Sequence, residues 1–318
     1  MTSRHISVCI PVYNESENIR MAVETIERVF REKLPGYTLE LVVTDNASTD
    51  QTWETVKQMA EARPHLRAFR FSRNFGYQNS VFAGLCLAGG DAVVEVDADL
   101  EDPPEVIPEF VKQWEAGYEV VYGVRRKRHT SPLLKLPIYI FYRFLNSMVE
   151  RPIPNDAGDF RLLDRKVVEV LRELPERNLY LRGLVSFVGF RQIGLPYDRN
   201  PRLAGKSKFR LFHYIVLAID AVTAFSKFPL RLIGLLGVLF FVLTAGLGFY
   251  YLIAAFFFGV DVRGFTTQVV LTLFLHSLTF IFLGIIGEYL SRIFDDSKFR
   301  PRVIISETVN AGEGRRML

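Results

Sequence analysis

Cysteine is scarce in this 318-residue sequence, which contains only Cys9 and Cys86. Both lie in apolar runs, and neither has a second cysteine or a histidine at the spacing of a metal ligand pair. This excludes a disulfide scaffold and a structural zinc site. We expect two small buried thiols in a reducing compartment.

Glycine-rich nucleotide motifs are also missing, since neither GxGxxG nor GxxxxGK[ST] occurs. Dinucleotide-binding and P-loop sites are therefore unsupported. A secretory signal is not evident, because residues 1–5 are polar and the apolar run at 6–12 is too short for one. We expect the first two hundred residues to stay in the cytoplasm.

Charged residues make up 23% of the chain against 49% hydrophobic residues, and the mean hydropathy is +0.15. Residues 232–260 contain no charge, and residues 264–287 contain only the titratable His276. Each run exceeds the roughly 20 residues that span a bilayer as a helix. The sequence predicts two transmembrane helices joined as a hairpin, which excludes a purely soluble enzyme.

Basic residues flank this hairpin on both sides. Lys227 and Arg231 precede it, and Arg292, Lys298 and Arg300 are among those that follow. Such a bias predicts that both ends are cytoplasmic. We expect a multi-pass protein of the inner (plasma) membrane with a cytoplasmic tail at 291–318.

Two amphipathic segments precede the hairpin, at residues 132–149 and 206–229. Basic amphipathic helices of this kind lie in the headgroup plane of a membrane. The alternative is an ordinary helix that faces a core. The net charge of +4 has a location, because the basic residues cluster at 125–231 and after 292, beside the predicted membrane segments. The expected partners are therefore a membrane and lipid phosphate, and nucleic acid is not expected.

Strands and helices alternate along residues 1–205. Such alternation predicts an α/β domain with a mostly parallel sheet and helices on both faces. Its ligands are expected at the carboxyl ends of the strands. Residues 14–16 can cap the first helix. The expected strands are 6–12, 39–43, 66–71 and 92–96, and the expected helices are 19–30, 51–62 and 79–87.

Asp97 and Asp99 directly follow the strand at 92–96. Their i, i+2 spacing points both carboxylates to one side. Hard carboxylates without nearby His or Cys suit Mg²⁺ or Mn²⁺, with positions left open for phosphate oxygens. The alternative is a solvated acidic loop closed by Pro103 and Pro104.

Polar segments at 11–15, 45–50 and 73–78 follow the other three strands. Carboxylates and amides there are suited to binding the base edge and the ribose hydroxyls of a nucleotide. Asp45 and Asp50 also have the alternative of being turn and cap residues.

Five ordered segments give a specific resemblance: PVYNESENI, VVTDNASTD, SRNFGYQNS, DADLEDPPE and DAGDFRLLD. They resemble the family 2 glycosyltransferases, and most closely the polyprenyl-phosphate branch, which includes dolichyl-phosphate mannose synthases and bacterial undecaprenyl-phosphate glucosyltransferases. The resemblance covers about residues 5–230. It implies a GT-A-like (Rossmann-like) domain, and the hairpin is similar to that of bacterial members.

The resemblance also implies roles for individual residues. Asp97 and Asp99 match the metal motif, and Glu101, where many relatives have Gln, is a third candidate ligand. Asp156 matches the catalytic position at the acceptor side of the sugar, with Asp159 as its rival and Asp99 as a further catalytic candidate. The expected nucleotide-sugar residues are Pro11, Tyr13, Asn14, Glu15, Asp45, Ser48, Arg73, Gly76 and Asp97.

Cations are expected to hold the acceptor phosphate. The alternative is a solvated patch attracted to anionic lipid. A lipid phosphomonoester has a second pKa of about 6, so its oxygen needs little help from a base. The candidates are Arg125, Arg126, Arg128, Lys135, Arg202 and Lys206.

The expected reaction is a single inverting displacement that moves glucose from UDP-glucose to undecaprenyl phosphate. GDP-mannose and a UDP-amino sugar are alternative donors. A processive polysaccharide synthase is a more remote alternative, because a QxxRW-like motif is not found. A non-catalytic lipid-phosphate-binding membrane protein is a second remote alternative. The resemblance further implies a homo-oligomer, expected to be a tetramer.

Overall fold

The computed structural model describes residues 4–126, 157–176, 179–200, 228–258 and 264–311. The chain divides into two compact units, residues 1–211 with 299–318 and residues 212–298. The first unit therefore resumes after the second in the sequence. The predicted interfacial segments at 132–149 and 206–229 lie outside the described residues, except for residues 228–229, which begin the helix Phe228–Phe258.

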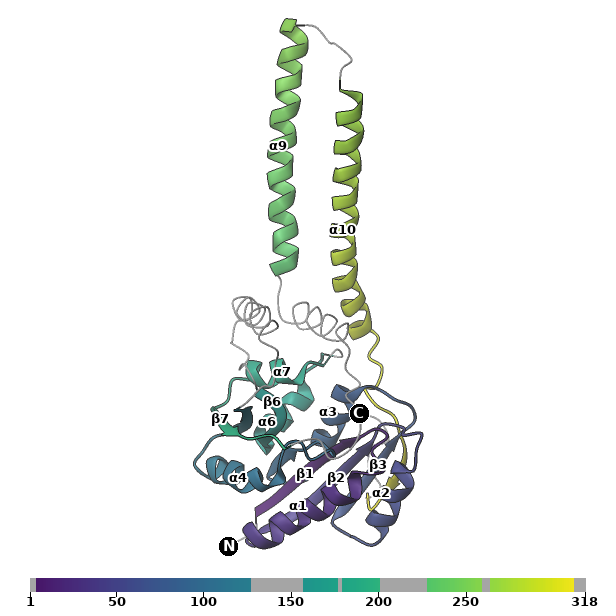
Figure 1. Ribbon diagram of the computed structural model, residues 1–318, viewed down its shortest axis with the longest axis vertical. Coiled ribbons are helices and arrows are strands. Elements are labelled where there is room, and N and C mark those ends of the chain that lie inside the picture. The colour runs from purple at the N-terminus through teal and green to yellow at the C-terminus, as the bar shows by residue number, and fades with distance from the viewer. Residues whose placement is uncertain (1–3, 127–156, 177–178, 201–227, 259–263, 312–318) are drawn as a thin grey trace. The chain divides into compact units, whose positions relative to one another are not determined.

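An eight-stranded sheet forms the centre of the first unit (Figure 1), in the order β7-β5-β6-β4-β1-β2-β3-β8. Strands β1 to β4 pair in parallel, as do β5 and β7, whereas β6 and β8 are antiparallel to their neighbours. The strands are β1 Arg4–Val12, β2 Tyr37–Asp45, β3 Leu66–Phe71, β4 Ala92–Glu95, β5 Val120–Arg125, β6 Ala157–Asp164, β7 Gln192–Tyr197 and β8 Ile305–Val309.

Helices cover both faces of this sheet, and β1 is therefore buried on both faces for most of its length. Ile6 belongs to a core cluster with Ile19 and Val23 of α1, whereas Cys9 lies close to Gly84 of α3. The predicted fold class is thus confirmed. The helices are α1 Ile19–Lys33, α2 Thr52–Glu61, α3 Tyr77–Leu87, η1 Pro104–Val106, α4 Ile107–Glu115, α6 Arg165–Glu173 and α7 Leu181–Phe187.

Strand β8 was not predicted from the sequence, which set residues 291–318 apart as a tail. It follows the apolar hairpin in the chain and pairs antiparallel with β3 at the edge of the sheet. Val303 and Ile305 are buried. The Asn310 side-chain amide donates to the carbonyls of Ala60, Arg63 and Leu66. The segment is therefore an integral part of the first unit.

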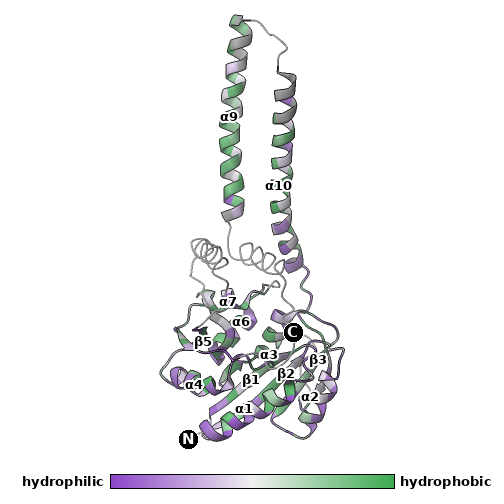
Figure 2. Ribbon diagram, viewed as in Figure 1, coloured by the Kyte–Doolittle hydropathy of each residue, from purple (hydrophilic) through white to green (hydrophobic). Residues whose placement is uncertain are grey.

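The second unit contains two long helices, α9 Phe228–Phe258 and α10 Phe265–Ser297. Pro229–Tyr250 and Leu271–Ser297 are long and apolar enough to cross a membrane. Hydrophobic residues predominate along both helices (Figure 2), and Phe241 and Phe280 are each 72% exposed. The structure thus has both helices of the predicted hairpin, with α10 extending past residue 287.

Gly90 provides a test of the packing between β1 and β4. A Cβ at this buried position would lie 2.6 Å from the Ser7 backbone nitrogen and 2.8 Å from the His5 carbonyl oxygen. Because backbone atoms cannot yield as a flexible side chain can, we expect Gly90→Ala to lower the free energy of unfolding by about 1–3 kcal/mol. Thermal unfolding of the purified protein measures this.

Gly36→Ala is the matched control, since a Cβ at Gly36 would have no atom of the described part of the chain within 4 Å. This variant should unfold at the wild-type temperature. Equal midpoints for the two variants would contradict the expected clash.

Candidate functional site

The sheet has a topological switch point between β1 and β4. The chain runs from β1 to β2 and β3 on one side, and then returns to β4 on the other side of β1. In α/β sheets, ligands bind at the carboxyl ends of the strands that flank such a point. Most of the described candidate residues follow these strand ends or those of the neighbouring β2 and β3.

The loops after β1 and β2 are tied together by hydrogen bonds. The Asn14 backbone nitrogen donates to Ser48 Oγ at 2.9 Å, and Asn14 Oδ1 accepts from the Thr49 nitrogen at 2.8 Å. The Glu15 nitrogen donates to Thr52 Oγ1 at 2.8 Å. Asn14, with a φ of 56°, therefore joins two loops.

The prediction that residues 14–16 cap α1 is wrong. The helix begins at Ile19, and Asn18 at its N-cap makes no side-chain capping bond. The Glu15 carbonyl instead accepts from the backbone nitrogens of Asn18 and Ile19. The polar side chain of Asn14 is used by the neighbouring loop, which sequence periodicity does not reveal.

Asp45 ends β2 with a fully buried side chain. Its carboxylate accepts from the Ser48 nitrogen at 3.2 Å and lies 3.5 Å from Arg70 Nε. Burial raises the pKa of Asp45, against the opposing effects of Ser48 and Arg70. Of the other predicted nucleoside residues at this edge, Pro11 is buried and Tyr13 is exposed.

The loop that carries Arg73 and Gly76 is attached to the end of β2. The Asn46 side chain donates to Asn74 Oδ1 at 3.0 Å and accepts from the Phe75 nitrogen at 2.9 Å. Gly76 has a φ of 89°, which favours glycine, and its nitrogen donates to Asn74 Oδ1. The sequence did not single out Asn46 or Asn74, although asparagine in loops is a common turn signal.

Asp97 and Asp99 follow β4 with partly exposed side chains. The Tyr77 hydroxyl donates to Asp97 Oδ1 at 2.8 Å. Burial, then the negative charges of Asp159 and Asp99, raise the pKa of Asp97 to about 7, although the Tyr77 bond opposes the shift. Tyr77 was not predicted individually, because its contact with Asp97 joins two different loops.

The donor set at Asp97 and Asp99 fits a divalent metal that takes its other ligands from phosphate and water. Burial and the negative charges of Asp159 and Asp99 both disfavour the ionised form of Asp97, and a bound cation would favour it. Among the described residues, no three His, Cys, Asp or Glu side chains form a group able to hold a metal alone. Glu101 forms an ion pair with Arg199, and its role as a ligand stays a prediction.

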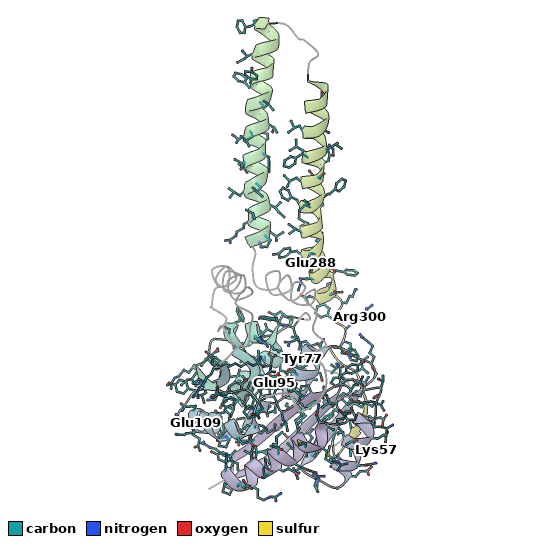
Figure 3. All side chains as sticks on the ribbon, in the orientation of Figure 1. Lys57, Tyr77, Glu95, Glu109, Glu288 and Arg300 are labelled. Carbon is teal, nitrogen blue, oxygen red and sulfur yellow. The ribbon has the colours of Figure 1, made fainter. Side chains whose placement is uncertain are left out.

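Glu95, two residues before Asp97, is buried, and neither of its oxygens has a hydrogen-bond partner among the described residues. The nearest cationic atom that pairs with it is Arg161 Nε, at 3.4 Å. Burial raises its pKa well above the ordinary value, and the charges of Asp159 and Asp97 add to the shift. Glu95 and Tyr77 lie near one another in this unit (Figure 3).

Asp159 is held by two arginines. Arg182 donates to both of its oxygens at 2.8 Å, and Arg161 donates to Oδ1 at 2.8 Å. Burial opposes ionisation, but the bonds and charge of Arg182, with Arg161, lower the pKa of Asp159 to about 2. Asp159 is therefore a poor proton acceptor at neutral pH. Its rival Asp156 lies outside the described residues.

Two of the predicted phosphate-binding cations are described, and both are paired. Arg125 donates to Asp102 at 3.3 Å and to the Tyr197 hydroxyl at 3.3 Å. Arg126 is exposed and lies 3.4 Å from Asp198. The remaining predicted cations, Arg128, Lys135, Arg202 and Lys206, lie outside the described residues.

The buried carboxyl of Glu95 predicts an unusual pH dependence of stability. Glu95 has a pKa near 4.3 in the unfolded chain and a raised pKa in the folded state. Above pH 4.3 the folded state therefore holds a proton that the unfolded state has lost, so stability falls as pH rises. Gln cannot titrate. We expect Glu95→Gln to become more stable relative to wild type between pH 5 and pH 8.

Denaturant unfolding in a metal-free buffer measures this difference. Glu109→Gln on α4 (labelled in Figure 3), where the side chain is 50% exposed, controls for the loss of a negative charge. A Glu95→Gln difference that stays constant with pH would show that Glu95 does not hold the extra proton.

Comparison with known proteins places these motifs in a family. The chain matches glycosyl transferase family 2 over residues 7–172. It is 39% identical to the uncharacterized glycosyltransferase YkcC of Bacillus subtilis (strain 168), covering 96% of this chain and 95% of that protein. It is also 39% identical to the bactoprenol glucosyl transferase of Shigella phage SfV, covering 94% and 97%.

A solved structure, the mannosyltransferase PcManGT from Pyrobaculum calidifontis in complex with GDP-Man and Mn²⁺, aligns with 70% of this chain and 62% of its own. The identity is 21% and the TM-score is 0.47. The ordered motifs, the mixed sheet and the whole-length similarity to these relatives agree: the chain belongs to glycosyl transferase family 2 and is a glycosyltransferase.

Proposed function

We propose that the protein transfers glucose from UDP-glucose to the phosphate of a polyisoprenyl lipid, undecaprenyl phosphate, with inversion at the anomeric carbon. One observation carries this proposal. The similarity to proteins named bactoprenol glucosyl transferase extends over 94–95% of the chain, and therefore includes the apolar helices as well as the family domain.

The apolar helices explain how such an acceptor would be reached. Large exposed patches of apolar side chains on α9 and α10 require a cover. A lipid bilayer provides it, with both termini and residues 1–205 on the cytoplasmic side of the inner membrane. The water-soluble donor then enters from the cytoplasm while the prenyl tail remains in lipid. A tetramer is part of the same proposal.

The residues at the ends of β1 and β2 would bind the donor nucleotide. Asp45 and the loop of Asn14 and Ser48 meet there, and the loop of Arg73 and Gly76 is attached to the same strand end. Asp97 and Asp99 would hold Mg²⁺ or Mn²⁺ beside the diphosphate. When bound, the metal supplies positive charge that stabilises the leaving diphosphate.

The acceptor needs positioning more than activation. Its phosphate oxygen is largely ionised at neutral pH, because the second pKa of a phosphomonoester is about 6. Asp159 would act by holding Arg182 and Arg161 in place. The catalytic role at the acceptor side is assigned to Asp156. Among the described cations, the exposed Arg126 is better placed for an anionic lipid than Arg125, which is held by Asp102.

One assay tests the reaction. Purified protein is incubated with undecaprenyl phosphate, Mg²⁺ or Mn²⁺, and a panel of radiolabelled UDP and GDP sugars, and the products are separated by thin-layer chromatography. We expect UDP-glucose to give a labelled lipid. Label from GDP-mannose or a UDP-amino sugar alone would support the alternative donors, and release of free sugar without a lipid product would contradict the proposal.

The carboxylates after β4 give a second test. We expect Asp97→Asn and Asp99→Asn each to lower turnover by on the order of 10²-fold or more, because a neutral amide binds a divalent cation poorly and leaves the diphosphate charge unopposed. Both variants should also lose Mn²⁺ binding, measured as free Mn²⁺ by electron paramagnetic resonance.

Asp91→Asn is the matched control, since Asp91 precedes the amino end of β4 and accepts from the His5 nitrogen there. It should retain wild-type turnover. Near-normal turnover of Asp97→Asn and Asp99→Asn would rule out the metal assignment.

A further inference from the structure

One row of residues crosses the sheet at the end where β1 and β2 finish. Val12 is paired with Asp45, Asp45 with Arg70, and Arg70 with Glu307. Glu307 belongs to β8, the strand that follows the apolar hairpin in the chain. The segment after the hairpin therefore stands two strands away from a candidate nucleotide-binding residue.

Ion pairs run along this row. Arg70 Nε lies 3.5 Å from Asp45 Oδ2, and Arg70 Nη1 lies 3.4 Å from Glu307 Oε1. The guanidinium also donates to the Ser48 carbonyl at 3.4 Å. Arg70 is thus shared among three groups, two of which were predicted to bind the nucleotide.

Glu307 is itself fixed by a second contact. Trp53 Nε1 donates to Glu307 Oε2 at 3.1 Å, and the Arg70 guanidinium lies over the Trp53 ring at 5.7 Å from its centre. Trp53 is buried in the core. The position of the Glu307 carboxylate is therefore set by a rigid neighbour, and the guanidinium is oriented between Glu307 and Asp45.

Asp45 depends on this arrangement because its carboxylate is fully buried. Hydrogen bonding from Ser48 and the positive charge of Arg70 lower the free energy of the charged form of Asp45. Arg70 also holds Ser48, whose hydroxyl accepts from the Asn14 nitrogen. A shift of the guanidinium would therefore change both the Asp45 carboxylate and the loop after β2, which Ser48 ties to the loop after β1.

We propose that Glu307 is a positioning residue for the donor nucleotide, which acts through Arg70 on Asp45 and Ser48. The segment that follows the hairpin is then part of the donor site and not a tail. This inference rests on the proposed function, in which Asp45 and Ser48 contact the nucleoside. It assigns Glu307 an effect on donor affinity, with no effect on the acceptor or the chemical step.

Glu307→Gln tests the inference with little change in shape. Gln keeps an oxygen that can accept from Trp53 but removes the charge beside Arg70. We expect the Kd for UDP, measured by calorimetry, and the KM for UDP-glucose to rise by about three- to fivefold, as expected for a partly exposed ion pair. The value of kcat and the KM for undecaprenyl phosphate should stay within about twofold.

Glu115→Gln is the matched control. The Glu115 side chain is 50% exposed against 49% for Glu307, and it pairs with Arg4 at 3.3 Å. Arg4 begins β1, at the amino end of the sheet, whereas Glu307 is in register with the carboxyl end of β2. This variant should bind UDP with wild-type affinity.

A double-mutant cycle separates positioning from a loosened edge strand. If Glu307 acts through Arg70, Glu307→Gln should have no further effect on UDP affinity in an Arg70→Gln background. If it only holds β8 in place, its effect should be the same in both backgrounds and the unfolding midpoint should fall. Additive effects, or an unchanged Kd for Glu307→Gln alone, would overturn the inference.

Wild-type binding distinguishes the two levels of the proposal. If wild-type protein and Glu307→Gln bind UDP with equal affinity, the positioning role is refuted, but the proposed glycosyl transfer is not. Wild-type protein that binds neither UDP nor GDP would refute the proposed function, and the inference with it.

Discussion

The concentration of carboxyl groups at the end of β4 is the constraint on which the site depends. Glu95, Asp97 and Asp159 influence one another electrostatically. Arg161 and Arg182 pair with Asp159, and Arg161 also approaches Glu95. Asp97 is left with a tyrosine hydroxyl and a pKa of about 7. The partly exposed carboxylates that the arginines do not neutralise are suited to an added cation, which is why the metal is proposed to bind here.

Much of the fold could be predicted because its signals are local. Buried parallel strands read as mostly apolar runs, so the four predicted strands lie at or within a few residues of β1, β2, β3 and β4, with β3 at its observed bounds. Strands β5, β6 and β7 were not predicted. The two apolar helices follow from composition. Strand β8 could not be found in this way, since it has five residues and the three in its middle, Ser306, Glu307 and Thr308, are polar and exposed. Its pairing with β3 comes from tertiary structure alone.

In the candidate site, too, local features could be predicted from the sequence and contacts between distant residues could not. Asp97 and Asp99 could be identified because their spacing at a strand end is visible in the sequence. The partners that control charge could not, because Arg182, Arg70 and Tyr77 come from other elements and meet the carboxylates only in the folded chain. The sequence also could not show the ion pairs that Arg125 forms with Asp102 and Glu101 forms with Arg199, and their roles as ligands stay predictions.

The position of β8 after the hairpin has a consequence for the order of synthesis. Residues of β1 to β7 leave the ribosome before either apolar helix, but the edge of β3 stays open until both helices have been made. An open edge is a template for unwanted pairing between chains. Completion of the sheet therefore comes after emergence of the hairpin, so that a nascent chain stalled before residue 305 would carry an unfinished edge beside β3.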